Sequence, residues 1–134
     1  EAEFIAMQRA LADANVQPVE IDYVNAHGTS TPVGDIEEAK ALTRLFSGAK
    51  QPFVSSTKSM TGHENSMAGA SEAVYSILMM QHGFVAPNIN IQNKIDEAKD
   101  LNIVTEAIYT PIKTILSNSS GMGGSHSALV LKRI

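Results

Sequence analysis

Cysteine is absent from this sequence of 134 residues. A disulfide, a thiolate metal site and a cysteine nucleophile are therefore all excluded within the chain. The sequence also lacks an apolar run of the ~18 residues that a membrane-spanning helix needs, so we predict no membrane segment. No basic segment followed by an apolar stretch occurs at its start, and we expect no signal peptide.

Positive charge is also scarce. The 10 Lys and Arg residues are outnumbered by 14 Asp and Glu residues, which gives a formal net charge of -4. Proteins that bind nucleic acid electrostatically show a basic excess, so we expect no nucleic-acid partner. Hydrophobic residues make up 43% and charged residues 18%, which excludes a disordered acidic tail. The length suits one domain, or one half of a larger two-lobed protein.

Two helices are predicted in the first part of the chain. Apolar residues recur at helical spacing across residues 4–11. Asp35 and Glu38 match a capping box, which predicts that a second helix begins near Asp35 and ends at residues 47–48.

A third and longer helix is predicted over residues 65–82. Thr61 and Glu64 match a capping box at its start, and Gly83 is placed to stop it. The segment contains no Lys or Arg and is apolar nearly all round. Such a helix is normally buried inside a domain, so we expect it to be covered from several sides.

Short β-branched and apolar runs predict strands at residues 21–25, 52–56, 101–104, 113–117 and 125–131. Residues 57–60 and 87–100 are expected to be irregular. Helices and strands alternate first, and two adjacent strands close the chain. This order predicts an α/β fold with a mixed β-sheet flanked by α-helices, in layers α/β/α.

Two histidines are candidate catalytic residues because of their positions. His27 follows a predicted strand, and open α/β sheets bind ligands just past the carboxyl ends of strands. His63 falls in the predicted first turn of helix 65–82, where the helix dipole favours a neutral imidazole. Two such donors on one oxygen would stabilise an enolate. A helix cap or a packed polar group remains the more common role for such a histidine.

Other groups are weaker candidates. The carboxylate of Glu72 in an apolar helix needs a partner, and Lys58 is one possibility. The Gly-Met-Gly-Gly turn at residues 121–124 either presents backbone N–H groups to an oxyanion or forms a tight hairpin with positive φ angles. His82 and His126 are less favoured. No histidine pair has metal-ligand spacing, so we expect no metal site. We also expect no cofactor.

Three motifs resemble those of the β-ketoacyl-[acyl-carrier-protein] synthases. Residues 24–35, which read VNAHGTSTPVGD, resemble that family's first histidine motif. Residues 56–63, STKSMTGH, resemble its lysine and second histidine motif, and residues 117–124, SNSSGMGG, resemble its closing glycine turn. The resemblance extends from about residue 7 to residue 134. Residues 87–105 are most similar to the type I enzyme of bacterial fatty-acid synthesis.

The resemblance implies the thiolase fold, in which two similar halves stack, and residues 1–134 match the C-terminal half. The family's nucleophilic cysteine lies in the N-terminal half, so we expect the isolated chain to be inactive. The implied activity is that of a cytoplasmic acyltransferase, a 3-oxoacyl-[acyl-carrier-protein] synthase. It carries out a decarboxylating Claisen condensation in fatty-acid or related polyketide synthesis. Implied partners are acyl- and malonyl-loaded acyl carrier protein, the N-terminal half and, for the full-length enzyme, a second copy in a homodimer.

The resemblance also implies residue roles. His27 and His63 would bind the malonyl thioester oxygen, and Lys58 would order the site with support from Glu72. The backbone N–H of residue 122 would be one oxyanion-hole donor. The acyl pocket would include Ser120, Met122, Thr29 and Thr31.

Departures from the family pattern support an alternative. The family usually has Phe at the positions of Ser120 and Met122, and Thr-Asn at Ser125 and His126. Loss of a ring at Ser120 implies a gap or a wider acyl tunnel. A non-catalytic ketosynthase-like partner of the chain-length-factor type is therefore the second hypothesis. A stand-alone binding module is the third, and the need to cover helix 65–82 argues against it.

Overall fold

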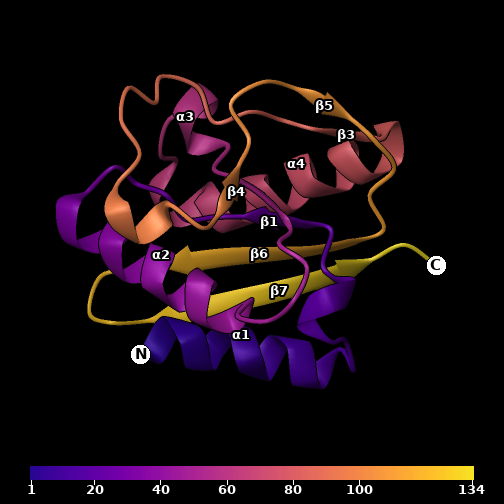
Figure 1. Cartoon of the computed structure of the whole chain (residues 1–134), viewed down its shortest axis with the longest axis horizontal. Helices are drawn as coiled ribbons and strands as arrows, with labels where there is room; N and C mark the ends of the chain where they lie inside the picture. Colours follow the sequence, from indigo (N-terminus) through magenta and orange to yellow (C-terminus); the bar gives the residue numbers. More distant parts are fainter.

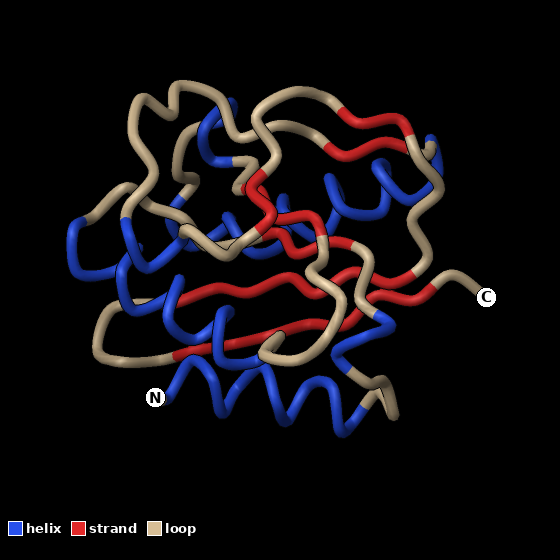
Figure 2. The backbone as a smooth tube through the Cα atoms, viewed as in Figure 1, coloured by secondary structure: helices blue, strands red, loops and turns tan.

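A five-stranded mixed sheet forms the centre of the molecule, for which a computed structural model describes residues 1–134 (Figure 2). Its strand order is β4-β2-β1-β6-β7. The strands are β1 (Tyr23–Asn25), β2 (Phe53–Ser55), β4 (Asn102–Ile103), β6 (Thr114–Ser120) and β7 (His126–Lys132). All five predicted strands are present, with shifted ends, and the predicted mixed sheet is confirmed.

Strand β1 is central and buried throughout. It pairs in parallel with β2 on one side and β6 on the other, so the carboxyl ends of these three strands lie at one edge. Strand β7 pairs antiparallel with β6, and this hairpin places Ser120 opposite His126. His27 lies in the loop that leaves this edge after β1, and Ser120 ends β6 at the same edge.

Helices cover both faces of the sheet (Figure 1). Helices α1 (Ala2–Asp13) and α2 (Pro32–Leu45) pack on one face, in a core that includes Val24 and Leu116. Helix α4 (Ala68–His82) packs on the other face, in a core that includes Tyr23 and Ile115. Adjacent residues of β1 and β6 thus enter opposite cores, as the alternation of side chains along a strand requires. The predicted α/β/α layering is confirmed.

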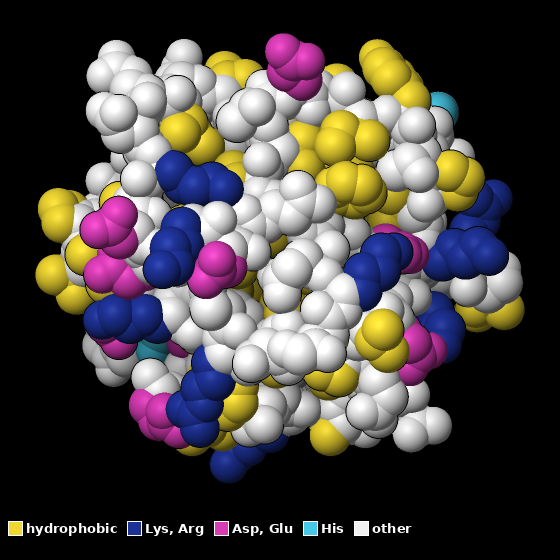
Figure 3. Space-filling view, viewed as in Figure 1, with side chains coloured by type: hydrophobic (Ala, Val, Ile, Leu, Met, Phe, Trp, Pro, Cys, Tyr) yellow, Lys and Arg dark blue, Asp and Glu magenta, His cyan; other side chains and the backbone are white.

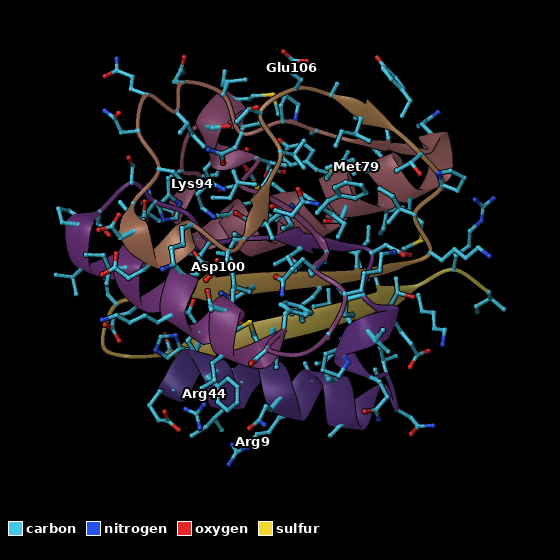
Figure 4. The ribbon with its side chains drawn as sticks, viewed as in Figure 1. Arg9, Arg44, Met79, Lys94, Asp100 and Glu106 are labelled. Atoms are coloured by element: carbon cyan, nitrogen blue, oxygen red, sulfur yellow. The ribbon has the colours of Figure 1, made fainter.

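The two helices on the first face are also joined at their surface. The guanidinium carbon of Arg44 in α2 lies over the ring of Phe4 in α1, 3.9 Å from the ring centroid. Figure 4 shows Arg44 beside α1. Its guanidinium also pairs with Glu1 at 2.5 Å. Figure 3 shows acidic and basic side chains interspersed on this face around α1 and α2.

Smaller elements complete the fold. A two-stranded antiparallel sheet of β3 (Phe84–Val85) and β5 (Ile108–Tyr109) contributes to the same core as α4, and the sequence pattern did not predict it. The remaining elements are α3 (Lys58–Thr61) and the 3-10 turns η1 (Pro18–Glu20), η2 (Asn65–Met67) and η3 (Asp96–Ala98). None of the helices has the length and hydropathy required to cross a bilayer.

Both predicted capping boxes are wrong. Helix α2 begins at Pro32, so Asp35 lies inside it, where its carboxylate accepts the N–H of Ser30 at 3.1 Å. Helix α4 begins only at Ala68, and Thr61 instead ends α3, in the segment predicted to be a loop. Gly83 does stop α4, with the left-handed φ of 67° that a glycine adopts easily.

Helix α4 carries apolar residues on both of its sides. The side that faces the sheet buries the polar residues Glu72 and Ser76 together with Met79 and Met80. The opposite side exposes Val74, Ile77 and Leu78, at 53%, 41% and 42% of their surface. The helix is therefore covered on one side only, and the prediction that it is covered from several sides is not met within this chain.

The turn after β1 depends on Gly28. Its φ is +43°, and a Cβ atom added there would lie 2.6 Å from Cβ of Ser56. We predict that Gly28→Ala destabilises the intact protein by about 2–5 kcal/mol, because strain and overlap add. Urea unfolding measures this effect. The control Gly48→Ala, with φ of +75° and open space, should cost only about 1–2 kcal/mol. Equal losses in the two variants would contradict the close approach to Ser56.

Candidate active site

The two predicted histidines lie together. The ring centroids of His27 and His63 are 5.4 Å apart, and the rings meet edge to face at 89°. Both line a cavity of about 290 Å³ at the carboxyl edge of the sheet. His27 follows β1 as predicted, but His63 lies in the loop between α3 and η2, five residues before α4. The helix-dipole argument for His63 is therefore wrong, although the pairing of the two rings is confirmed.

Hydrogen bonding and burial define the state of each ring. The backbone N–H of Asn65 donates to Nδ1 of His63 at 3.2 Å, so a neutral His63 ring carries its hydrogen on Nε2 and can donate from there. Burial, followed by the charges of Lys58, His63 and His126, lowers the pKa of His27 to about 4. His27 is therefore a neutral imidazole throughout the physiological pH range.

Lys58 and Glu72 form a buried ion pair beside the histidines. The ammonium of Lys58 bonds Oε1 of Glu72, and the two side chains are 5% and 2% exposed. Ser119 donates to the other carboxylate oxygen, Oε2, at 3.0 Å. The expected partnership of Lys58 and Glu72 is confirmed. It places a positive charge close enough to His27 to help keep that ring uncharged.

Glu38 is a site residue that sequence analysis missed. Its Oε1 accepts the backbone N–H of His27 at 2.7 Å, and Oε2 accepts that of Gly28 at 2.8 Å. Asn118 donates to Oε1 at 2.9 Å, and burial raises the pKa of Glu38 to about 7. The signal was present in the sequence, because Glu38 shares one helix face with the buried residues Leu42 and Leu45. A carboxylate on an apolar helix face needs a polar partner.

The predicted acyl-pocket residues are spread over different places. Ser120 lines the cavity of the two histidines, whereas Thr29 lines a second cavity of about 770 Å³. Thr31 lines neither and shares a hydrogen bond of 3.2 Å with Thr29. Met122 is fully exposed and also lines neither cavity, so its oxyanion role stays a prediction.

The glycine turn is a tight hairpin, and His126 belongs to its base. Gly123 and Gly124 have φ angles of 80° and 79°, as the hairpin interpretation requires. His126 lines the cavity of His27 and His63, although it was a weak candidate. His82, at the end of α4, lines neither cavity.

The buried ion pair can be tested by Lys58→Met. We expect the loss of about 3–5 kcal/mol of stability in the intact protein, because the carboxylate of Glu72 stays buried without its cation. We also expect the pKa of His27 to rise above about 4, because a nearby positive charge is removed. Chemical denaturation and an NMR titration of the ring measure the two effects. The control is Lys40→Met, which removes a surface pair with Glu37 and should change both readouts little.

Comparison with known proteins is consistent with this geometry. Residues 1–92 match the family described as beta-ketoacyl synthase, C-terminal domain. The 3-oxoacyl-[acyl-carrier-protein] synthase 1 of Escherichia coli (strain K12) is 51% identical over 114 residues, which are 85% of this chain and 28% of that protein. This chain thus spans less than a third of that relative's length.

Solved structures give the same result. A beta-ketoacyl synthase from Burkholderia phymatum STM815 has a TM-score of 0.92 at 36% identity, over 98% of this chain and 32% of that one. The AntDE:AntF structure, a type II PKS acyl-carrier protein in complex with its ketosynthase, has a TM-score of 0.89 at 37% identity, over 100% of this chain and 34% of that one. The chain therefore belongs to the beta-ketoacyl synthase family, in which it corresponds to the C-terminal domain.

Proposed function

We propose that this chain is the enolate-stabilising part of a 3-oxoacyl-[acyl-carrier-protein] synthase. The observation that carries the proposal is the contact of His27 and His63 at the wall of one cavity, with ring centroids 5.4 Å apart. Two imidazole donors at this distance can both reach a single oxygen atom. Preorganised donors of this kind stabilise negative charge that develops in a transition state.

The proposed reaction begins with a malonyl thioester whose carbonyl oxygen accepts hydrogen bonds from His27 and His63. The bond to the carboxylate breaks, carbon dioxide leaves, and the electron pair passes into the thioester to form an enolate. The enolate carbon then attacks an acyl thioester on the cysteine of the N-terminal half. The cysteine thiolate leaves, and a 3-oxoacyl thioester remains on the carrier protein.

The ionisation of the site suits this reaction. At neutral pH an uncharged His27 can donate a hydrogen bond. Its protonation state stays the same across the physiological pH range, because its pKa is lowered to about 4. Lys58 supplies a positive charge near the developing enolate, and Glu72 fixes its position. In enzymes that stabilise an oxyanion, removal of one hydrogen-bond donor of the kind proposed for His27 and His63 typically lowers the rate by about 10²–10³-fold.

The proposed carrier-protein partner has support from one structural relative. That structure holds an acyl-carrier protein in complex with its ketosynthase, and one of its chains is 37% identical to this chain. We also propose the homodimer of the full-length enzyme, and this proposal is based on the family resemblance. The chain-length-factor alternative is not favoured, because the paired histidines and the Lys58–Glu72 ion pair are both present.

The catalytic assignment predicts a separation of two steps. In the full-length enzyme, His27→Ala or His63→Ala should reduce malonyl decarboxylation by about 10²-fold or more, because an enolate donor is lost. Transfer of the acyl group to the cysteine should remain largely intact, because that step forms no malonyl enolate. Release of labelled carbon dioxide and formation of the acyl-enzyme measure the two steps. Normal decarboxylation in both variants would overturn the assignment.

We also propose that residues 1–134 form a domain whose missing cover is the N-terminal half of the same enzyme. The exposed apolar side of α4 supports this proposal, since large exposed apolar patches mark interaction surfaces. Ile77 and Leu78 belong to this side and are about two-fifths exposed.

The cover on α4 can be tested in the full-length enzyme with Ile77→Glu. We expect a loss of several kcal/mol, because the new carboxylate would be buried at the interface without a partner. Thermal or urea unfolding measures this loss. Val19→Glu, at an exposed residue of η1, is the control and should stay within about 0.5 kcal/mol. If Ile77→Glu were as harmless as the control, α4 would not be covered at this side.

A further inference from the structure

The cavity of the two histidines has an unusually polar wall. Ala68 is the only hydrophobic residue among the 12 that line it. Ser120 and His126 contribute from facing ends of β6 and β7, where they form the last pair of the hairpin. A polar wall suits a substrate group that forms hydrogen bonds better than it suits an alkyl chain.

A hydrogen-bond chain behind this wall fixes the ring of His126. Ser120 donates its hydroxyl hydrogen to Oε1 of Glu3 at 3.2 Å, and Glu3 is buried with 6% of its surface exposed. Asn118 donates to the same Glu3 oxygen at 2.6 Å and holds the carboxylate in place. The Ser120 hydroxyl has only one hydrogen, so its 2.9 Å bond with Nδ1 of His126 must be donated by the ring.

The tautomer of His126 follows from this direction. A neutral His126 ring carries its hydrogen on Nδ1, and Nε2 is left as an acceptor. Nε2 forms no hydrogen bond within the chain and is not among its buried unpaired atoms, and His126 lines the cavity. His63 has the opposite arrangement, because Asn65 occupies its Nδ1 and its hydrogen lies on Nε2. The cavity therefore combines a ring donor and a ring acceptor.

We propose that His126 is a substrate-contacting residue, whose Nε2 accepts a hydrogen bond from an amide N–H or a hydroxyl of the thioester substrate. Ser120 and Glu3 are then positioning residues that hold the ring in its acceptor tautomer. The proposal rests on the proposed function for the nature of the substrate. The family resemblance places Asn at this position, and an Asn side chain also contains an acceptor oxygen.

Two sources can supply the donor. The thiol arm of a carrier protein contains amide N–H groups, which accompany every substrate. The arm also contains a hydroxyl group, whereas the acyl chain offers a hydroxyl only when the chain itself is oxygenated. The experiment separates these sources with four unreactive thioether analogues. Two carry a saturated alkyl chain on the sulfur of either pantetheine or an alkyl thiol without amides, and two carry a 3-hydroxyalkyl chain on the same two sulfurs.

Binding to the full-length enzyme is measured by calorimetry for wild type, His126→Leu and His126→Asn. We expect His126→Leu to weaken binding about tenfold for analogues that contain the relevant donor, because a buried hydrogen bond is lost. A loss confined to the pantetheine analogues identifies the arm, and a loss confined to the hydroxylated analogues identifies the acyl chain. His126→Asn should retain binding within about threefold, because its amide oxygen still accepts. Equal affinities of wild type and His126→Leu for all four analogues would overturn the proposal.

A separate measurement tests whether Ser120 and Glu3 hold the ring of His126 in its acceptor tautomer. Nitrogen NMR of histidine-labelled enzyme should show His126 with hydrogen on Nδ1, and Ser120→Ala should shift the ring toward the Nε2–H form. An Nε2–H tautomer in the wild type would overturn the proposal. Decarboxylation of malonyl carrier protein is assayed separately, so that its absence counts against the proposed function while the binding and NMR results still decide the role of His126.

Discussion

The Glu38 carboxylate holds the candidate site in place. It reaches from α2 under the turn after β1 and accepts the backbone N–H groups of His27 and Gly28. A carboxylate buried to this degree is costly unless its oxygens are satisfied, and Asn118 supplies a further hydrogen bond. The same Asn118 donates to Glu3, so α1, α2 and β6 meet at one amide group. This network fixes the backbone of His27 from below and, through Glu3 and Ser120, the ring of His126.

A second network of buried polar residues fixes the site from the opposite face of the sheet. Lys58 and Glu72 pair beneath α4, and Asn25 at the end of β1 bonds both the backbone oxygen of Glu72 and the hydroxyl of Ser76. The carboxyl ends of β1 and β6 are thus held between two buried polar networks. Histidine rings mounted on such a frame need little rearrangement when charge develops on a bound oxygen, which is the condition for strong electrostatic stabilisation.

Much of this arrangement follows from short-range sequence pattern, and the exceptions have a common physical cause. The strands, the position of His27 after β1 and the need of Glu72 for a cation could be predicted, because each depends on local periodicity or on the cost of a buried charge. The start of α4 could not, because Glu64 does not cap the helix and instead accepts hydroxyl groups of Ser71 and Tyr75. The sequence motif also assigned Glu38 to a helix cap. The groups that Glu38 bonds lie instead in the loop after β1 and in β6. In both places the glutamate bonds groups outside the four-residue motif, which a capping-box pattern does not consider.

The exposed apolar side of α4 bears on the proposed second half. Glu72 and Ser76 face the sheet, where they bond Lys58 and Asn25, and Val74 and Ile77 are left on the outside. His63 is exposed in this chain and lies just before the same helix. A second half that covers the apolar side of α4 would therefore also close over the histidine cavity. Exclusion of water lowers the local dielectric and strengthens each hydrogen bond to a developing enolate. In this proposal, one apolar surface both assembles the two halves and dries the site between them.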